Sequence, residues 1–247
     1  MLKIIKWFFI ILAILLISLT AIYMTTPEPG EFLNKNPGLT SFMKKRIDDA
    51  KSKGENLHIY HQYIKYSDIN KHLKAAVRIS EDGGFFFHNG FDFGEIKESI
   101  KTNFKEKRFK RGGSTISQQL VKNLYLSSNK SLLRKVKEAV LTCKLENQLS
   151  KIRIFSLYLN YIELGNGIFG VEAACRKYFR KSAGNITIFE AARLASIIPN
   201  PRKRNPNNPS KTLRYKTKIL LTRLYKFKKI SKQDYNTAMG EFKLFFH

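Results

Sequence analysis

The sequence contains an uncharged apolar run that is long enough to cross a membrane. Residues 7–24 read WFFIILAILLISLTAIYM and carry no charged side chain. As an α-helix rising about 1.5 Å per residue, this run spans about 27 Å, close to the ~30 Å hydrocarbon core of a bilayer. If the run is kept, the rest of the chain must fold and work beside a membrane surface.

The flanks of this run favour a retained anchor over a cleaved signal peptide. Lys3 and Lys6 precede it, and positive charge keeps that end of a helix in the cytoplasm. A signal peptide usually has a shorter apolar region that ends in a small-x-small site, of which Ser18 to Ala21 is a poor version. We therefore expect a cytoplasmic N-terminus at residues 1–6 and a transmembrane anchor at 7–24, with the remainder outside the membrane.

The chain that follows the anchor is strongly basic. The whole sequence holds 45 Lys and Arg against 19 Asp and Glu, a formal net charge of +26, and all of these cations except Lys3 and Lys6 follow the anchor. Such a surface attracts anions, which include nucleic acid, acidic lipid headgroups and phosphorylated substrates. Hydrophobic residues make up 43%, which favours a packed core over a disordered chain. Cys143 and Cys175 lie in apolar helical contexts without a metal-ligand spacing, and we expect buried thiols.

Composition divides the exported chain into three parts. Residues 25–68 begin with a proline-rich linker and continue as a lysine-rich stretch of weak helical signal, which we interpret as a small accessory lobe or a stalk. An apolar helical periodicity begins near residue 69, and Pro199-Asn-Pro ends the pattern, so residues 69–201 are predicted to form the main, mostly α-helical domain. Residues 202–247 are expected to be a basic segment with one more helix.

A pair of glycines leads into an amphipathic helix in RFKRGGSTISQQLVKNLYL, residues 108–126. Ser114 or Thr115 can cap this helix, and its free backbone N–H groups would cradle a phosphate. Stacked amides on its polar face would hydrogen bond a ligand such as a sugar. An ordinary capped helix with a solvated polar face would show the same pattern. The ligand hypothesis rests on Arg108, Lys110, Arg111, Gln118, Gln119, Lys122 and Asn123.

Glu138 lies on a leucine-rich stripe of the helix predicted after residue 132. At about 100° per residue, Leu145 and Leu149 fall within about 20° of it, and apolar residues on the far side predict a helix that is buried in the domain. A lone buried carboxylate costs several kcal/mol, so it must be paired or functional. Arg134 and either Lys135 or Lys137 could pair with it, and a purely structural ion pair stays open.

A second group of acids stands in RISEDGGFFFHNGFD, residues 78–92. Glu81 follows a short apolar helix and precedes two glycines, so the chain turns there. The phenylalanines at 85–87 would shield Glu81 and raise its pKa toward that of a general base. A carboxylate at a cleft rim, opposite one on a buried helix, suits chemistry at a sugar carbon. A helix end with acids that face solvent is the alternative.

Five stretches in this order resemble the five motifs of the peptidoglycan glycosyltransferases (glycosyltransferase family 51), which polymerise lipid II. The anchor, the segment NPGLTSFMKKR and the short remainder after the domain are similar to the monofunctional biosynthetic peptidoglycan transglycosylases, since no room remains for a transpeptidase domain. The resemblance implies a mainly α, lysozyme-like helical glycosyltransferase domain with a small membrane-proximal lobe, preceded by one transmembrane helix. The stretches are EDGGFFFHNG (81–90), GGSTISQQ (112–119), RKVKE (134–138), KIRIFSLYLN (151–160) and GIFGVEAACRKYF (167–179).

The resemblance also implies roles for individual residues. Glu81 would be the general base that takes the proton from the 4-hydroxyl of the acceptor lipid II, whose oxygen attacks the anomeric carbon of the growing chain. Undecaprenyl pyrophosphate would leave with inversion, giving a β-1,4 bond. Glu138 would organise the cations near the donor pyrophosphate or hold a divalent metal ion, and no cofactor is required. The substrate-binding residues implied are Asp82, Gln118, Gln119, Lys122, Asn123, Lys130, Arg134, Lys135 and Lys137.

The sequence departs from the family pattern at a few positions, none of which removes a catalytic group. Lys130 stands where the family usually has Arg, which keeps the charge but loses the bidentate fork. Ser80 replaces a common Ala, Ser117 replaces a frequent Thr, and Gly83-Gly84 loosens the turn.

The resemblance further implies a set of partners and a location. The partners are lipid II, the growing lipid-linked glycan strand, the membrane and other cell wall synthases, but not nucleic acid. The location is the bacterial plasma (inner) membrane, as a single-pass protein with a periplasmic or extracellular catalytic domain.

Two other functions compete with this one. A glycan-cleaving muramidase or lytic transglycosylase on the same fold would need a carboxylic acid to protonate the leaving sugar oxygen, instead of a ring of cations. A basic membrane protein that binds nucleic acid or anionic lipid would not depend on Glu81.

Overall fold

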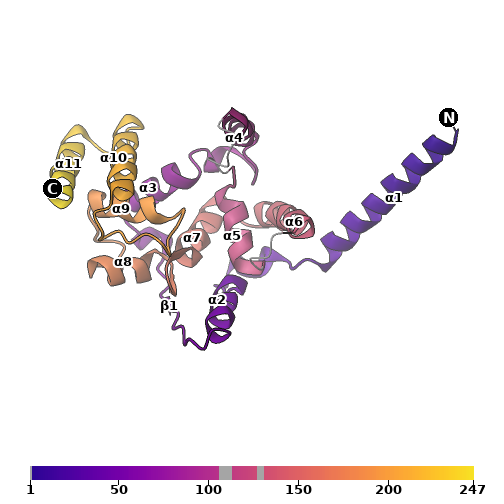
Figure 1. Cartoon of the computed structure of the whole chain (residues 1–247), viewed down its shortest axis with the longest axis horizontal. Helices are drawn as coiled ribbons and strands as arrows, with labels where there is room; N and C mark the ends of the chain where they lie inside the picture. The colour runs from indigo at the N-terminus through magenta and orange to yellow at the C-terminus, as the bar shows by residue number, and fades with distance from the viewer. Residues whose placement is uncertain (1, 106–112, 127–130) are drawn as a thin grey trace.

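Helices dominate the computed structural model, which describes residues 2–105, 113–126 and 131–247 (Figure 1). Lys130 and the cations predicted around the glycine turn at Arg108, Lys110 and Arg111 lie outside the described residues. The helices are α1 (Leu2–Thr25), α2 (Ser41–Lys51), α3 (Lys71–Glu81), α4 (Phe93–Lys105), α5 (Ile116–Tyr125), α6 (Leu132–Gln148), α7 (Lys151–Tyr161), α8 (Val171–Phe179), α9 (Ile188–Ile197), α10 (Lys211–Lys226) and α11 (Lys232–Phe246), with 3₁₀ turns η1 (Pro29–Leu33), η2 (Tyr66–Asp68) and η3 (Phe85–Phe87).

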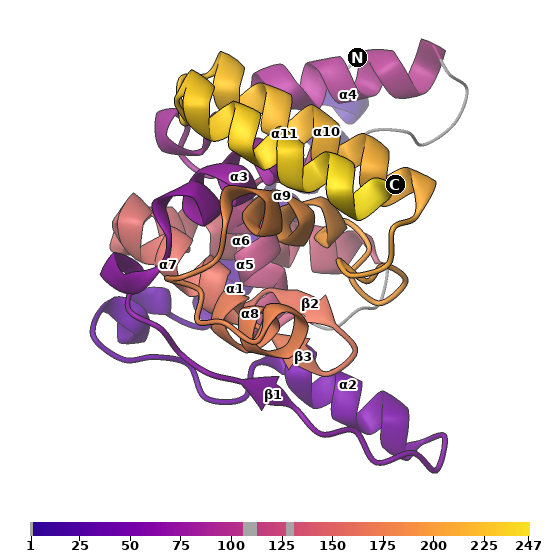
Figure 2. The ribbon, with the colours of Figure 1, turned by 90° about the vertical axis from the view of Figure 1, so that its left-hand side faces the viewer.

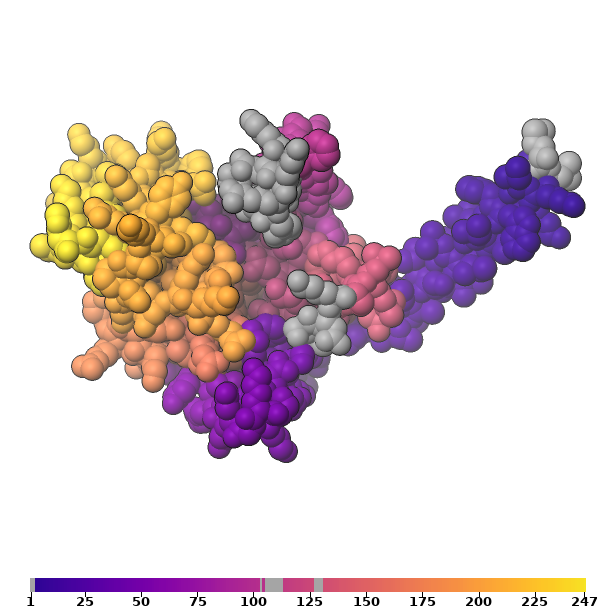
Figure 3. Space-filling view, in the orientation of Figure 1, coloured from indigo at the N-terminus to yellow at the C-terminus, as the bar shows by residue number. Residues whose placement is uncertain are grey.

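The first helix extends away from the rest of the chain. Its segment Lys3–Thr25 has a mean hydropathy of 2.5, and none of it is buried inside the protein. Figures 1 and 3 show α1 clear of the other helices over most of its length, with the N-terminus at the far end. By length and composition α1 can cross a membrane, which agrees with the anchor predicted at 7–24.

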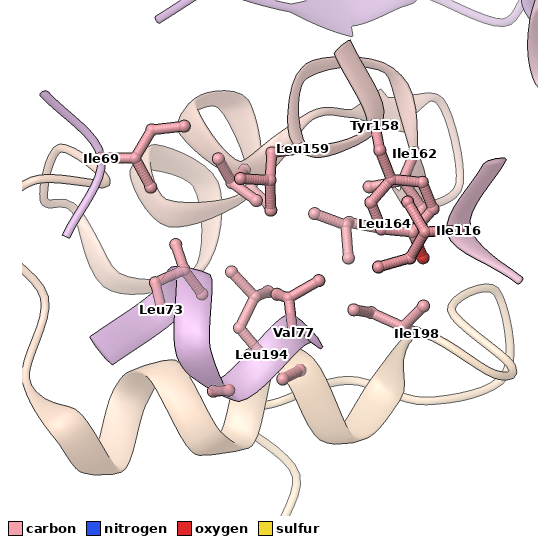
Figure 4. Packing of buried hydrophobic residues seen from close by; sticks show 14 of the residues in the cluster. Ile69, Leu73, Val77, Ile116, Tyr158, Leu159, Ile162, Leu164, Leu194 and Ile198 are labelled. Carbon is pink, nitrogen blue, oxygen red and sulfur yellow. The ribbon is translucent and has the colours of Figure 1, made fainter. Parts of the chain in front are cut away.

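The core includes the packing of α3 against α9 and α10 and the packing of α5 against α7. Leu73 and Val77, four residues apart on α3, lie in one buried cluster with Leu194 of α9 (Figure 4). Ile116 at the start of α5 and Tyr158 of α7 come together on another side of this cluster, and both are fully buried. Side chains at period 3.6 on each helix supply these contacts. The packing fixes the C-terminal end of α3, where Glu81 stands.

A small sheet joins the membrane-proximal segment to the domain. Its strands are β1 (Tyr60–His61), β2 (Glu163–Gly165) and β3 (Ile168–Phe169), in the order β1-β3-β2, with β1 parallel and β2 antiparallel to β3. The buried Asn160 side chain accepts from the N–H of Ile64 at 2.8 Å and donates to its carbonyl at 3.1 Å. These contacts attach the chain around residues 60–64 to α7.

The C-terminal segment forms two helices, where the sequence predicted one. Figure 2 shows α10 and α11 side by side over α3 and α9. The guanidinium group of Arg193 on α9 lies 4.7 Å from the ring centre of Phe189 and 4.1 Å from that of Phe245. Phe242 and Phe246 are buried beside Phe189. We missed α11 because its aromatic residues acquire an apolar partner only when α9 folds against them.

The predictions for α6 and its cysteine were partly wrong. Only one face of α6 is buried, and Leu132 and Leu133 in its first turn are 83% and 55% exposed. Cys143 is exposed because it lies on the uncovered face, whereas Cys175 is buried as predicted, and burial raises the pKa of the Cys175 thiol. Apolar residues around most of a helix therefore did not mean burial on every side.

Candidate active site

Glu81 is the last residue of α3, and its carboxylate is held by neutral donors. The Ser80 hydroxyl donates to one oxygen at 3.1 Å, and Nε2 of Gln119 donates to the other at 3.3 Å. The Tyr158 hydroxyl donates to Oε1 of Gln119 at 3.1 Å, which orients that amide. Burial raises the pKa of Glu81, and these hydrogen bonds together with the charge of Lys216 partly oppose the rise. The arrangement gives a positioned carboxylate that binds a proton more readily than an exposed one.

Gln118, the neighbour of Gln119, takes part in the N-terminal cap of α5. The Thr115 hydroxyl accepts from the N–H of Gln118 at 3.3 Å, and Oε1 of Gln118 accepts from the N–H of Thr115 at 3.0 Å. This reciprocal capping box satisfies N–H groups that would otherwise lack partners. Thr115 is thus the cap, one of the two alternatives that the sequence left. The substrate-binding role of Gln118 stays a prediction.

Asp82 connects the turn after α3 to the N-terminus of α5. Its buried carboxylate accepts from the N–H of Ile116 at 3.0 Å, and Nε2 of His88 lies 3.0 and 3.1 Å from its two oxygens. Since the N–H groups of Ile116 and Gln118 are taken by protein side chains, this helix end does not favour the phosphate cradle that the glycine turn suggested.

Two of the three rings predicted to shield Glu81 are exposed, and the shielding role of the third, Phe85, stays a prediction. Phe86 is 41% and Phe87 is 89% exposed, and only Phe85 is buried. The ring centre of Phe85 lies 5.6 Å from that of Phe155 on α7. These side chains point in different directions because a 3₁₀ turn spreads consecutive residues around its axis.

A pocket of about 470 Å³ opens beside Glu81 and Asp82. Thr115 forms part of its wall, and Arg223 and Phe227 reach it from α10 and the residue after it. Sequence reasoning missed the last two residues. The basic helix containing them was predicted, but its position beside α3 depends on packing between distant segments.

One group in the part of the chain that the structure describes could hold a metal ion. Ligand atoms of Asp82, His88 and Asp92 lie within 4.8 Å of one another. Glu138, for which the family resemblance implied either cations or a metal ion, lies against two cations. The metal-ligand role of Glu138 stays a prediction.

Glu138 is buried on α6 and forms the predicted ion pairs. Nη1 of Arg134 donates to one carboxylate oxygen at 2.7 Å, and Nζ of Lys135 donates to the other. The spacings of four and three residues place all three side chains on one side of the helix. Lys137 lies on the same helix and is half-buried.

Helix α5 joins the two carboxylates. Lys122 is three residues beyond Gln119, so both side chains lie on adjacent parts of one helical face, about 4.5 Å apart along the axis. Burial lowers the pKa of Lys122, and the charge of Glu138 opposes that shift. Asn123 beside it is buried. We call Glu138 and its partners Arg134 and Lys135 the Glu138 cluster. One face of α5 therefore lies near Glu81 at one end and near the Glu138 cluster at the other.

The sequence profile described as Transglycosylase matches residues 50–225. The chain belongs to the transglycosylase family. The matched region of the family includes nearly all of α10 and extends beyond the predicted domain at 69–201, whose bounds stay a prediction.

Relatives with the printed name biosynthetic peptidoglycan transglycosylase agree with this family. The protein from Dechloromonas aromatica is 47% identical over 76% of this chain and 82% of its own length. The protein from Janthinobacterium is 39% identical over 90% of this chain and 95% of its own length. A crystal structure of penicillin-binding protein 1A from Haemophilus influenzae aligns with 50% of this chain and 15% of its own, at 28% identity and a TM-score of 0.33, a superposition too poor to carry a structural argument.

Proposed function

We propose that this chain is a peptidoglycan glycosyltransferase of bacterial cell wall synthesis, which polymerises lipid II into β-1,4-linked glycan strands. The family and the names of the relatives support the class of activity. The reaction inverts the anomeric carbon and releases undecaprenyl pyrophosphate.

The observation that carries the proposal is the environment of the Glu81 carboxylate. Its carboxylate stands at a pocket wall, both of its oxygens accept from neutral donors, and burial raises its pKa. Within the described residues the Glu81 carboxylate forms no ion pair at contact distance, and a carboxylate held by neutral donors keeps the affinity for a proton that a general base requires. We propose that Glu81 takes the proton of the acceptor 4-hydroxyl. The oxygen then forms a bond to the anomeric carbon, and the bond from that carbon to the pyrophosphate oxygen breaks.

The Glu138 cluster supplies the second half of the chemistry. A departing pyrophosphate carries negative charge, which fixed cations stabilise without an acid catalyst. We assign this role to Lys122, Arg134 and Lys135, oriented by Glu138, together with Lys130 and Lys137. No cofactor is required in this scheme. Asp82, Gln118, Gln119 and Asn123 are proposed to position the sugars, directly or through the groups that they hold.

The apolar helix α1 supports a membrane-bound location for this reaction. We propose a single-pass protein of the bacterial plasma (inner) membrane, with a cytoplasmic N-terminus and a periplasmic or extracellular catalytic domain. The lipid tails of donor and acceptor then lie in the bilayer that α1 crosses. Other cell wall synthases are proposed as partners, whereas nucleic acid is not.

Incubation of the full chain with lipid II in lipid bilayers tests the proposal. Synthesis predicts long glycan chains and release of undecaprenyl pyrophosphate. A cleaving enzyme would leave lipid II unchanged and would release fragments from purified sacculi, and that pair of results would refute the proposal. The cations around Glu138 favour synthesis, because cleavage of a sugar–sugar bond needs a proton donor at the leaving oxygen.

A further inference from the structure

Lys144 is a buried cation that the proposed chemistry does not use. It lies on α6, its side chain is 2% exposed, and its Nζ donates to the carbonyl of Tyr23 at 2.7 Å, the carbonyl of Thr26 at 3.1 Å and Oε1 of Glu28 at 2.6 Å. An ammonium group has three N–H donors, so these three oxygens satisfy it. Burial of a lysine is costly unless it is paired in this way.

All three acceptors belong to the C-terminal end of the apolar helix and the residues just after it. The last carbonyls of a helix lack intrahelical partners, and the helix dipole places negative charge there. Nζ of Lys144 also lies 4.3 Å from the ring centre of Tyr23. Nε2 of Gln148, one turn further along α6, donates to the other oxygen of Glu28 at 2.6 Å. Lys144 and Gln148 of α6 therefore hold the C-terminal end of α1 and the residues just after it.

The contact joins the anchor to the helix that carries the Glu138 cluster. Glu138 precedes Lys144 by six residues, about 9 Å along α6. The apolar part of α1 has few other contacts in the described chain. The direction of α1 relative to the domain therefore depends on the contacts that α6 makes with the C-terminal end of α1.

We propose that Lys144 is a positioning residue, which clamps the end of α1 to α6 and thereby holds the Glu138 cluster at a fixed height and orientation over the bilayer. The clamp itself follows from the contacts of Lys144, whereas its effect on polymerisation rests on the proposed function. A substrate with its pyrophosphate at the bilayer surface is aligned only if that surface has a fixed place relative to α6.

Pairwise distance measurements in bilayers test the clamp without reference to activity. Spin labels at Ile11→Cys on α1 and Asn147→Cys on α6, in a Cys143→Ser background, report the direction of α1 by double electron–electron resonance in lipid nanodiscs. Both label sites are exposed, and Cys175 is buried. The unsubstituted Lys144 should give one narrow distance distribution. Lys144→Met should broaden it severalfold, and Lys144→Arg, which keeps the charge, should restore most of the narrowing.

Lys218→Met is the matched control, since it removes the same charge from an exposed position on α10, and it should leave the distribution narrow. An equally narrow distribution for Lys144→Met in a folded protein would overturn the proposal. If Lys144→Met does not fold, Glu28→Gln weakens one of the three contacts and should broaden the distribution partially. No broadening there would overturn the clamp as well.

Polymerisation of lipid II in the same nanodiscs gives the functional readout. A misplacement of about 1 Å can cost on the order of 10²-fold in rate, so Lys144→Met should lose about tenfold or more, with rescue by Lys144→Arg. A broadened distribution with an unchanged rate would overturn the positioning role. Absence of polymerisation by the unaltered chain would refute the proposed function and leave the clamp standing.

Discussion

The exchange Glu81→Gln tests the proposed chemistry with the smallest change in shape. The amide keeps one oxygen, which accepts from Nε2 of Gln119 as the carboxylate does. Its NH₂ group then faces the Ser80 hydroxyl, which can accept as well as donate. The hydrogen bonds of the site are retained, and only the proton-accepting carboxylate is lost.

In the Glu81→Gln variant the rate of polymerisation should fall, whereas the thermal stability should stay the same or rise. Loss of a general base lowers the rate by about 10²–10⁴-fold, or about 2.7–5.4 kcal/mol in the activation barrier. Burial raises the pKa of Glu81 in the folded chain above its ordinary value of 4.5. The free energy of unfolding therefore falls as the pH rises through the interval between the unfolded and folded pKa values, and it stays lower at neutral pH. Gln carries no charge to bury, so the variant should unfold at the same or a higher temperature at pH 7.

The assay combines glycan synthesis from lipid II with thermal unfolding of the same preparation. A variant that is at least as stable as the parent but more than 100-fold slower would support the general base. A rate within tenfold of the parent would refute it, because no other described group takes over the acceptor proton in this scheme. A large loss of stability would show instead that the carboxylate holds the site together.

Three further exchanges test other parts of the site and fold. Lys216→Met removes a charge that lowers the pKa of Glu81, so the acid limb of the pH profile of kcat/KM should shift to higher pH, and an unmoved limb would contradict the coupling. Glu138→Gln should reduce turnover by about tenfold or more, because Arg134 loses its orientation. The same exchange should lower the free energy of unfolding by only about 1 kcal/mol in urea titrations, since both cations that pair with Glu138 are partly exposed. Unchanged turnover would remove Glu138 from the mechanism. Arg193→Met removes a cation that lies among the rings of Phe179, Phe189 and Phe245, and it should lower the free energy of unfolding by about 2–4 kcal/mol, measured by calorimetry. The fraction that remains folded should have normal activity. A reduced specific activity would contradict a purely structural role.

The spacing between residues that are close in the sequence determined much of the local structure of this protein. The apolar run of α1 follows from composition alone, and the helix that contains Glu138 follows from periodicity. The pairing of Glu138 with Arg134 could be predicted because both lie on one helix, where a separation of four residues fixes their distance. Capping at Thr115 could be narrowed to two residues for the same reason. Such features depend on the geometry of a single turn, which neighbouring residues decide.

Only the tertiary structure decided which distant segments meet. Gln119 is 38 positions from Glu81 along the chain, and Lys144 is 121 positions from Tyr23, yet each pair is in contact. The place of α10 beside α3 is of this kind, and so is the exposure of Cys143. These contacts depend on which apolar faces cover one another, a property of the whole packed set of helices and not of any one segment. For that reason the residue types for the chemistry could be read in advance, whereas the wall of the pocket and the attachment of the anchor could not.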